Sequence, residues 1–373
     1  MLEKFQYTDK QLITIIFFLI CLGTVMLYSA SSQYANQKFD SHTYFLSKHL
    51  FRVFLGLLLM IGISLYDYQN LKYKAPYILI FSILIILSGH LFSSGKTARW
   101  LIIGGKNIFT TSDIARIALI IFTSYYLEKS YRYIKDFKTG FLPIASIIGI
   151  VLMGIITQPD LSTAITIGLI LSMLLFIGGI RLKHLFTTTT IMFSSILFII
   201  WFKNGYQWQR ILNWINPTEG LQEGNYQSSQ AIIGLGNGGL WGQGIGNSVI
   251  KFPGLLPEVQ TDFIFSVMGE ELGFIGINII FCLFIWLFIR GIIIAKNSSD
   301  AFGMYLALGI IINITTYALI NICYVVGFLP TTGLPLPFFS YGGSNIIITL
   351  LSLGILINIS KKNKFNNIRR TIF

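Results

Sequence analysis

Charged side chains are scarce in this sequence. Only 11% of its 373 residues are Asp, Glu, Lys or Arg, whereas a soluble domain carries roughly 25%. Hydrophobic residues make up 54%, and several apolar runs reach the length of about 20 residues that a helix needs to cross a bilayer. The polar side chains are too few to cover a water-facing surface. The composition therefore predicts an all-α polytopic membrane protein.

Cysteine and histidine are also rare, and their spacing excludes the common disulfide and metal frameworks. The three cysteines lie within apolar runs and form no CxxC pair, and the four histidines show no metal-ligand spacing. The motifs G-x-S-x-G and H-E-x-x-H and the Walker sequence are absent. The sequence therefore predicts none of the soluble-enzyme chemistries that these motifs carry.

Basic residues outnumber acidic ones, 27 to 15, which gives a net charge of +12. They lie between the apolar segments rather than in one patch, as is typical of loop charges that set the topology of a membrane protein. We therefore expect no nucleic-acid partner.

Ten apolar segments predict ten transmembrane helices in a single domain, residues 1–373. The only long connection, residues 204–261, follows the seventh segment, and a basic tail, residues 361–373, follows the tenth. An even number of spans puts both termini on one face, and the positive-inside rule places that face in the cytoplasm and the long connection outside. The predicted spans cover residues 11–31, 48–66, 75–92, 112–128, 140–157, 161–179, 186–203, 262–290, 303–327 and 343–360.

The ninth and tenth segments are joined by LPTTGLPLPFFSYGGS, residues 329–344. Its three prolines and three glycines exclude a continuous helix, and its apolar content predicts a segment that dips into protein-lined membrane depth. We expect Gly342 and Gly343 to need a positive φ, which a β-branched residue adopts poorly. Ser340 and Ser344 are expected to donate hydrogen bonds there.

The stretch LPEVQTDFIFSVMGEELGFIG, residues 256–276, carries charge at membrane depth, which is costly and usually functional. In a continuous helix from Asp262, Glu270 would lie roughly 12 Å deeper and Glu271 on the opposite side. Neither would form the carboxylate pair, roughly 5 Å apart, of a retaining glycosidase. Asp262 is then a lone base, or acts with a metal, or caps the helix. Glu270 and Glu271 either hold helices together or support the site.

On the predicted topology, cations and carboxylates collect on the outer face beside an apolar bundle. Cations suit a diphosphate, a carboxylate suits proton abstraction from a hydroxyl, and an apolar groove suits a lipid tail. The combination favours a lipid-diphosphate-linked substrate. Arg52 and Arg116 have a second, compatible interpretation, a structural ion pair with Asp113, Glu270 or Glu271.

The glycine-rich run GLGNGGLWGQGIGNS, residues 234–248, has GxG spacings, but no strand precedes it, so it is a weak dinucleotide fingerprint. It predicts a tight structure packed on the helices. The alternative is phosphate binding by Ser248 or by backbone N–H groups.

Five short motifs carry a resemblance that covers nearly the whole chain. They are YSAS at 28–31, ARW at 98–100, QPDLSTA at 158–164, the 256–276 stretch and PTTGLPLPFFSYGGS at 330–344. With them the chain resembles the SEDS family (shape, elongation, division and sporulation), and its FtsW type more than its RodA type. The family implies ten transmembrane helices and a peptidoglycan glycosyltransferase that polymerises lipid II outside the cytoplasmic membrane. Its essential Asp aligns with Asp262.

One motif departs from the family pattern. Where family members have a QPSE-x-x-K run, this chain has Thr110-Thr111-Ser112-Asp113-Ile114-Ala115-Arg116. The charge signs are kept, but Asp is shorter than Glu, and Arg presents a planar fork where Lys is a point charge. The phosphate-binding geometry implied by the family is therefore altered at Arg116.

The resulting hypothesis is an inverting transfer in which Asp262 is catalytic and a divalent cation, Mg²⁺ or Mn²⁺, assists without a visible ligand set. The resemblance implies a class B penicillin-binding protein as partner, besides other divisome or elongasome membrane proteins. A lipid II flippase and a non-catalytic division scaffold are the alternatives. Substrate binding is assigned to Arg99, Arg116, Asp160, Arg210, Glu258, Thr261, Ser340 and Ser344. A structural or supporting role is assigned to Arg52, Asp113, Glu270, Glu271, Pro330, Gly342 and Gly343.

The predicted topology is open to a labelling test. A cysteine introduced near Gly220 should react with a membrane-impermeant thiol reagent in cells whose outer layer is permeabilised, because the basic loops hold the opposite face in the cytoplasm. Labelling of a cysteine in the 129–138 loop, with none near Gly220, would reverse the assignment.

Overall fold

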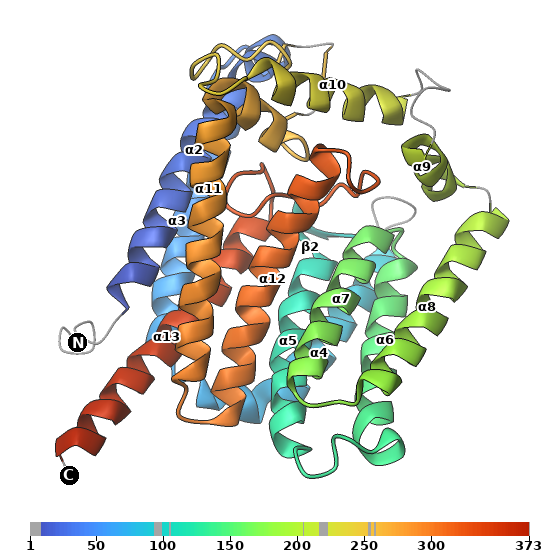
Figure 1. Cartoon of the computed structure of the whole chain (residues 1–373), viewed down its shortest axis with the longest axis vertical. Helices are drawn as coiled ribbons and strands as arrows, with labels where there is room; N and C mark the ends of the chain where they lie inside the picture. The colour runs from blue at the N-terminus through green and yellow to red at the C-terminus, as the bar shows by residue number, and fades with distance from the viewer. Residues whose placement is uncertain are drawn as a thin grey trace.

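The computed structural model describes residues 9–92, 99–103, 106–203, 205–215, 223–252, 255–256 and 259–372. In this part of the chain ten long helices form a bundle, and two shorter helices lie at one end of it (Figure 1). The long helices are α2 (Lys10–Phe39), α3 (Tyr44–Leu65), α4 (Gln69–Phe92), α5 (Thr111–Lys129), α6 (Leu142–Ile156), α7 (Leu161–Ile177), α8 (Leu182–Lys203), α11 (Ile264–Lys296), α12 (Ala301–Val325) and α13 (Asn345–Ile372). The short ones are α9 (Tyr206–Ile215) and α10 (Glu223–Asn237). A π-helical turn (Phe137–Phe141) leads into α6, and an antiparallel hairpin of β1 (Trp100–Ile103) and β2 (Lys106–Thr110) precedes α5.

Each predicted span coincides with one of the long helices. Among the described residues, seven helices are long and apolar enough to cross a membrane, and α7 is apolar but shorter. The predicted class, an α-helical polytopic membrane protein, is confirmed. The number of crossings stays a prediction. The short hairpin before α5 was not predicted.

Two helices extend well beyond the predicted spans. α2 continues to Phe39 instead of ending near residue 31, because residues 32–39 contain no proline or glycine that would stop it. α13 continues through the basic tail to Ile372. Part of the predicted polar loop and most of the predicted tail are therefore helical.

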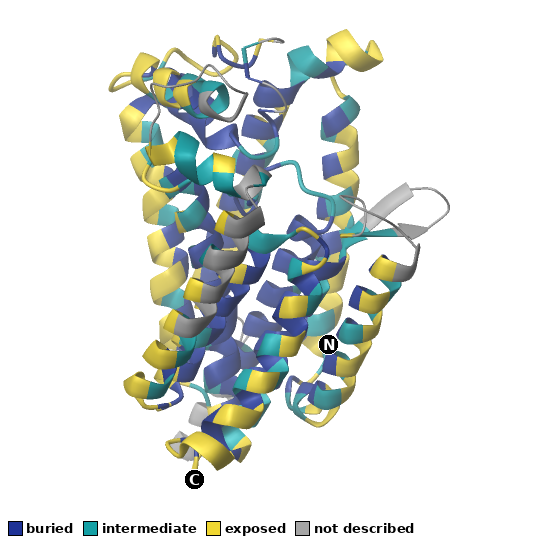
Figure 2. Ribbon diagram, turned by 90° about the vertical axis from the view of Figure 1, so that its right-hand side faces the viewer, coloured by how far each residue is buried: buried dark blue, intermediate teal, exposed yellow. Residues whose placement is uncertain are grey.

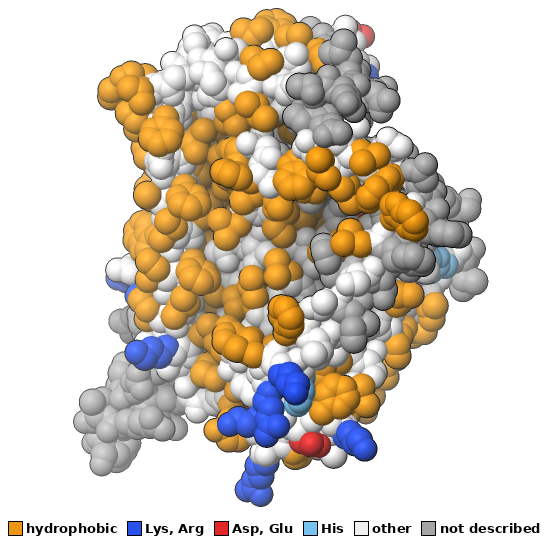
Figure 3. All heavy atoms as spheres, turned by 45° about the vertical axis from the view of Figure 1, so that its right-hand side comes forward, with side chains coloured by type: hydrophobic (Ala, Val, Ile, Leu, Met, Phe, Trp, Pro, Cys, Tyr) orange, Lys and Arg blue, Asp and Glu red, His pale blue; other side chains and the backbone are white. Residues whose placement is uncertain are grey.

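The outside of the bundle is apolar along most of its length. Large side chains such as Phe51, Ile150 and Phe186 are exposed, and Figure 2 shows buried residues inside the bundle with exposed ones on its outer faces. On the face drawn in Figure 3, Lys and Arg side chains gather at the lower end, below a broad hydrophobic zone. α2 begins and α13 ends at the lower end, whereas α9 and α10 lie at the upper end (Figure 1). This separation of a basic end from a broad apolar zone is typical of an integral membrane protein, and α2 begins and α13 ends towards the basic end.

Helix α11 is interrupted at Gly273, whose φ of 66° and ψ of −172° are not helical. The segment 238–244 of the glycine-rich run fills the interruption, and a Cβ at Gly273 would lie 2.2 Å from the Gly242 nitrogen. The N–H groups of Gln243 and Gly244 donate to the carbonyls of Glu270 and Glu271 at 2.9 and 3.0 Å, and those of Phe274 and Ile275 donate to Gly239 and Leu240 at 2.9 and 3.2 Å. The prediction of a tight structure packed on the helices is confirmed for this run.

The connection between α12 and α13 enters the bundle without forming a helix, as predicted. Phe338 and Phe339 are fully buried, and a Cβ on Gly23, in the middle of α2, would lie 2.2 Å from the Phe338 carbonyl oxygen. The prediction of positive φ at Gly342 and Gly343 is wrong.

In this connection the residues that take a positive φ are Gly327, at 88°, Gly333, at 71°, and Phe338, at 72°. A Cβ on Gly342 would make only ordinary contacts, the nearest at 3.4 Å. The tight turn therefore lies before the buried phenylalanines rather than after them, and a valine at Gly342 would meet no backbone strain of this kind.

Replacement of Gly273 tests the interrupted helix. Gly273→Ala should lower the free energy of unfolding by about 1–3 kcal/mol, because alanine is strained at this φ and its Cβ collides with the inserted segment. In Gly149→Ala, on α6, the added Cβ meets nothing within 4 Å, so that variant should be neutral or slightly stabilised. Thermal unfolding of the two purified variants measures the difference, and equal melting temperatures would contradict the interruption.

Candidate active site

Asp262 lies just before α11, on a segment that α12 holds in place. The Asn321 side-chain amide and the Tyr324 hydroxyl donate to its backbone carbonyl at 3.1 and 2.6 Å. Both groups also lie within hydrogen-bond distance of the Leu334 carbonyl, at 2.7 and 3.1 Å. One polar pair therefore fixes the Asp262 segment and the α12–α13 connection together. The half-buried carboxylate faces Gly333, where a Cβ would lie 3.4 Å from Oδ2.

The alternative in which Asp262 caps α11 is wrong. Phe263 occupies the N-cap position, and no side chain caps the helix from there. The helix begins at Ile264, two residues later than predicted, so the carboxylate lies outside the first turn. Its placement beside Gly333 instead gives it a position at the surface of the connection.

Arg210 reaches the same region from α9. Its Nη1 donates to the Thr331 carbonyl at 3.0 Å, and its charge, like that of Asp262, acts on the Tyr324 hydroxyl. A cavity of about 160 Å³ lies between α9, α10 and the end of α12, and Arg210, Tyr324 and Trp214 help to line it. The structure thus brings Arg210, a predicted cation, to a cavity that is also lined by Tyr324, whose hydroxyl binds the backbone carbonyl of Asp262, the predicted base.

A second polar cluster lies at the amino end of α5. The Arg116 guanidinium is 1% exposed and lies 3.1 Å from an Asp113 oxygen, 3.1 Å from the Asn345 amide oxygen and 4.1 Å above the Tyr317 ring. Asp113 also accepts hydrogen bonds from the hydroxyls of Thr110 and Ser344. Arg116 therefore forms the predicted structural ion pair with Asp113, and its contact with a substrate phosphate stays a prediction.

Asp160 extends this cluster towards α7. It accepts hydrogen bonds from Ser112 at 3.0 Å and from Thr163 at 2.6 Å. The neighbouring Gln158 accepts from Thr111 and donates to the Ile86 carbonyl at 2.8 Å. The QPD motif thus anchors α5 to α4 and α7, and Asp160 is engaged with protein hydroxyls.

Arg52 does not form the predicted ion pair with Asp113, Glu270 or Glu271 among the described residues. Its guanidinium instead lies 4.7 Å above the ring of Tyr341, in the α12–α13 connection. Arg52 therefore contacts this connection through a cation–π interaction.

Glu270 and Glu271 hold elements together, as one of their two predicted interpretations proposed. Glu271 pairs with Lys251 at 2.8 Å and accepts from Ser29 of α2 at 2.7 Å. Glu270 accepts from the Ser248 hydroxyl and from two backbone N–H groups of the same loop. Ser248 therefore binds a carboxylate, which argues against its predicted alternative as a phosphate ligand.

The remaining predicted residues are scattered. Arg99 is exposed, and its carbonyl accepts from the Thr111 N–H at 3.0 Å. Ser340 accepts from the Leu336 N–H at 2.8 Å. Thr261, Pro330 and Gly343 are half-buried, and Glu258 lies outside the described residues.

Sequence reasoning missed Asn321, Tyr324 and Lys251. Asn321 is fully buried within the apolar helix α12, and a buried amide in such a helix is a signal that could have been read. Nothing near Lys251 in the sequence indicates its ion pair, because its partner lies 20 residues further along the chain.

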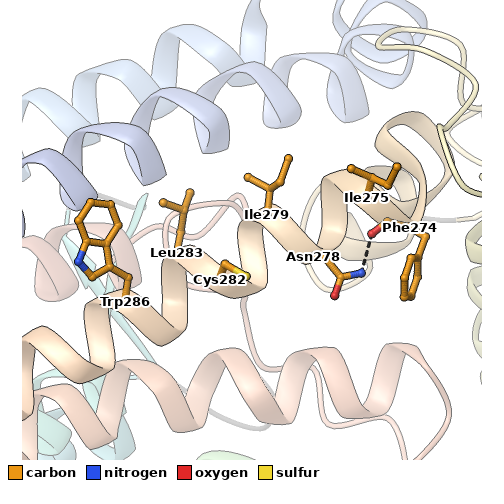
Figure 4. Close-up of a pocket in the computed structure, with 7 residues that line it drawn as sticks. All are labelled: Phe274, Ile275, Asn278, Ile279, Cys282, Leu283 and Trp286. Atoms are coloured by element: carbon orange, nitrogen blue, oxygen red, sulfur yellow. Dashed lines mark hydrogen bonds between the residues drawn. The ribbon is translucent and has the colours of Figure 1, made fainter.

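The larger cavity, of about 420 Å³, lies elsewhere. It is an open groove lined by α11 residues alone, Phe274, Ile275, Asn278, Ile279, Cys282, Leu283 and Trp286 (Figure 4). Asn278, its one amide side chain, donates to the Phe274 carbonyl at 2.8 Å. The groove holds none of the charged candidates, so it is not the reaction site.

Known proteins resemble this chain in sequence and in fold. The FtsW/RodA/SpoVE family, described as a cell cycle protein, matches residues 10–365. A probable peptidoglycan glycosyltransferase FtsW of Geobacter sulfurreducens is 39% identical over 350 residues, 93% of each chain. The stage V sporulation protein E of Bacillus subtilis is 33% identical over 361 residues, 96% of this chain and 98% of that one.

Two solved structures share the fold. A chain of a peptidoglycan synthase complex superposes with a TM-score of 0.77 at 22% identity, covering 95% of this chain and 98% of that one. The rod shape determining protein RodA of Thermus thermophilus gives 0.70 at 22% identity, covering 95% and 97%. The agreement over nearly the whole length places the helices of this chain in the same arrangement.

Arg116 offers a direct test of the ion-pair interpretation. Arg116→Ala should lower the free energy of unfolding by about 3–5 kcal/mol, because it leaves Asp113 buried without its cation. Arg116→Lys keeps the positive charge, so its free energy of unfolding should fall by less. Thermal unfolding and binding of a lipid-linked diphosphate are measured on both. Wild-type stability combined with lost diphosphate binding in Arg116→Ala would restore the substrate-binding role.

Proposed function

The chain belongs to the FtsW/RodA/SpoVE family, and we propose that this member, a peptidoglycan glycosyltransferase, polymerises lipid II at the outer face of the cytoplasmic membrane. The observation that carries the proposal is the position of Asp262. Its carboxylate is half-buried at the end of the bundle opposite the termini, on a segment fixed by Asn321 and Tyr324. A base held in this way meets its substrate in a defined orientation.

The proposed reaction is a single inverting displacement. The Asp262 carboxylate takes the proton of the acceptor sugar's 4-hydroxyl while that oxygen attacks the anomeric carbon of the lipid-linked donor. The new C–O bond forms as the bond to the diphosphate breaks, and undecaprenyl diphosphate leaves with the bonding electrons. General-base assistance contributes about 10²–10⁴ in rate, so stabilisation of the leaving diphosphate must supply much of the remainder.

Arg210 is the cation best placed for that stabilisation. It lines the polar cavity next to Tyr324, whereas Arg116 is buried in its ion pair and Arg99 lies at the hairpin before α5. The Nη1 of Arg210 donates to the Thr331 carbonyl at 3.0 Å, which holds the guanidinium against the α12–α13 connection. A guanidinium that lines a cavity offers a planar set of donors that matches the oxygens of a diphosphate.

A divalent cation fits this site only with help from the substrate. The described residues contain no group of three or more His, Cys, Asp or Glu side chains that could hold a metal. Mg²⁺ commonly takes one or two protein carboxylates together with phosphate oxygens. Asp262 is the carboxylate at this site, and a bound cation would supply charge neutralisation for the leaving diphosphate.

The biological setting follows from the relatives. Curated relatives with 39% and 37% identity are named FtsW, which favours cell division over elongation. A class B penicillin-binding protein is the proposed partner, since its transpeptidase would cross-link the new strand, and one solved structure of this fold comes from a synthase complex that couples polymerisation to crosslinking. Other divisome membrane proteins are further candidates. We propose, from the distribution of basic residues, that both termini lie in the cytoplasm.

Asp262→Asn tests the proposed chemistry. Asparagine keeps the size and hydrogen bonding of the side chain but cannot serve as a base, so the variant should fold and bind lipid II yet make no glycan strands. Polymerisation and binding are measured on purified full-length protein. Activity within a few-fold of wild type would remove Asp262 from the reaction. Loss of lipid II binding together with activity would point to a binding role instead.

A further inference from the structure

A buried ion pair joins Lys251 and Glu271, which lie before and after Asp262 in the sequence. Lys251 Nζ lies 2.8 Å from Glu271 Oε1, and the two side chains are 2% and 0% exposed. Ser29, from the YSAS motif of α2, donates to both carboxylate oxygens of Glu271 at 2.7 Å. The ion pair therefore links the two ends of the segment 251–271, which we call the closed segment, and Ser29 links the pair to α2.

Glu270, the residue before Glu271, binds the loop that carries Lys251. It accepts hydrogen bonds from the backbone N–H groups of Val249 and Ile250 at 3.0 and 3.2 Å, and from the Ser248 hydroxyl. Its charge is thus compensated by donors of the loop, while that of Glu271 is compensated by Lys251. Two successive carboxylates fix three successive loop residues and the lysine that follows them.

The closed segment contains a short half-helix that ends at the interruption of α11. Residues 264–272 are separated from the remainder of α11 by Gly273, whose φ of 66° lies in the left-handed region. Asp262 precedes the amino end of this half-helix, and Glu271 lies near its carboxyl end. A rotation of the half-helix about Gly273 would displace Asp262, and the Lys251–Glu271 pair opposes that rotation.

We propose that Lys251, Glu271 and Ser29 are positioning residues for Asp262: their buried contact holds the half-helix 264–272 in the orientation that aims the carboxylate at the acceptor hydroxyl. The inference rests on the proposed function, since it assigns Asp262 the role of base. It assigns the three residues no contact with substrate.

The test replaces both charges at once, because removal of one would leave the other buried and unpaired. The variant Lys251→Met/Glu271→Gln keeps side-chain size. Its kcat for lipid II polymerisation should fall by roughly 10- to 100-fold, the loss expected of a displacement of about 1 Å, with KM little changed. Hydrogen exchange in residues 259–272 should accelerate.

The matched control is a partly buried ion pair of the same helix. Arg290 and Asp9 lie 2.6 Å apart at the opposite end of α11. Arg290→Met/Asp9→Asn removes a similar pair, and asparagine keeps the cap that Asp9 gives α2. Its kcat should stay at the wild-type value. An equal fall of kcat in both double variants, or wild-type kcat in Lys251→Met/Glu271→Gln, would overturn the inference.

Ser29→Ala covers the case in which the double variant fails to fold. It removes the hydroxyl that binds Glu271 and leaves both charges in place, so kcat should fall a few-fold at unchanged KM, and an unchanged kcat would overturn the inference. Asp262→Asn is assayed alongside. If it is active, the proposed chemistry fails; if it is inactive while the ion-pair variants behave as wild type, the positioning inference alone fails.

Discussion

Every backbone N–H and C=O group at membrane depth needs a partner inside the protein, and the interruption of α11 at Gly273 leaves several without their helical partners. The glycine-rich segment 238–244 supplies them, and a close approach of backbone to backbone is possible because glycines face each other there. The buried carboxylates of Glu270 and Glu271 then hold the end of the same loop. The position of the half-helix depends on this insertion at its carboxyl end, while Asn321 and Tyr324 hold the Asp262 segment before its amino end.

The α12–α13 connection joins the two polar centres of the molecule. Near its start Gly333 faces the Asp262 carboxylate; further along, the Tyr341 N–H donates to the Gln260 carbonyl at 2.8 Å. At its end Ser344 donates to Asp113. Buried polar networks of this kind specify one arrangement because each unmade contact is costly in a medium of low dielectric constant. The α5 cluster therefore acts as a structural anchor for the connection that borders the proposed site.

Hydropathy alone located the long helices, because a membrane span must be apolar over its whole length. It could not reveal the interruption at Gly273, since glycine is frequent in unbroken transmembrane helices. Three glycines of the motif 329–344 were equally eligible for a positive φ, and of these only Gly333 takes one. Asp262 was found through its motif. Lys251 and Tyr324 were not, because their partners are brought to them by the fold. Arg116 was assigned a phosphate contact from the resemblance, with an ion pair as a compatible interpretation, and the fold shows the ion pair with Asp113.

The central claim is that the Asp262 carboxylate removes the proton of the acceptor hydroxyl. The most direct measurement is an experimental structure of the Asp262→Asn protein with lipid II in both donor and acceptor positions. The account predicts that the acceptor's 4-hydroxyl oxygen lies about 2.6–3.2 Å from the side chain of residue 262, or one water away, with the diphosphate of the donor near Arg210. A 4-hydroxyl directed at Asp113 or Asp160, beyond the reach of residue 262, would contradict it.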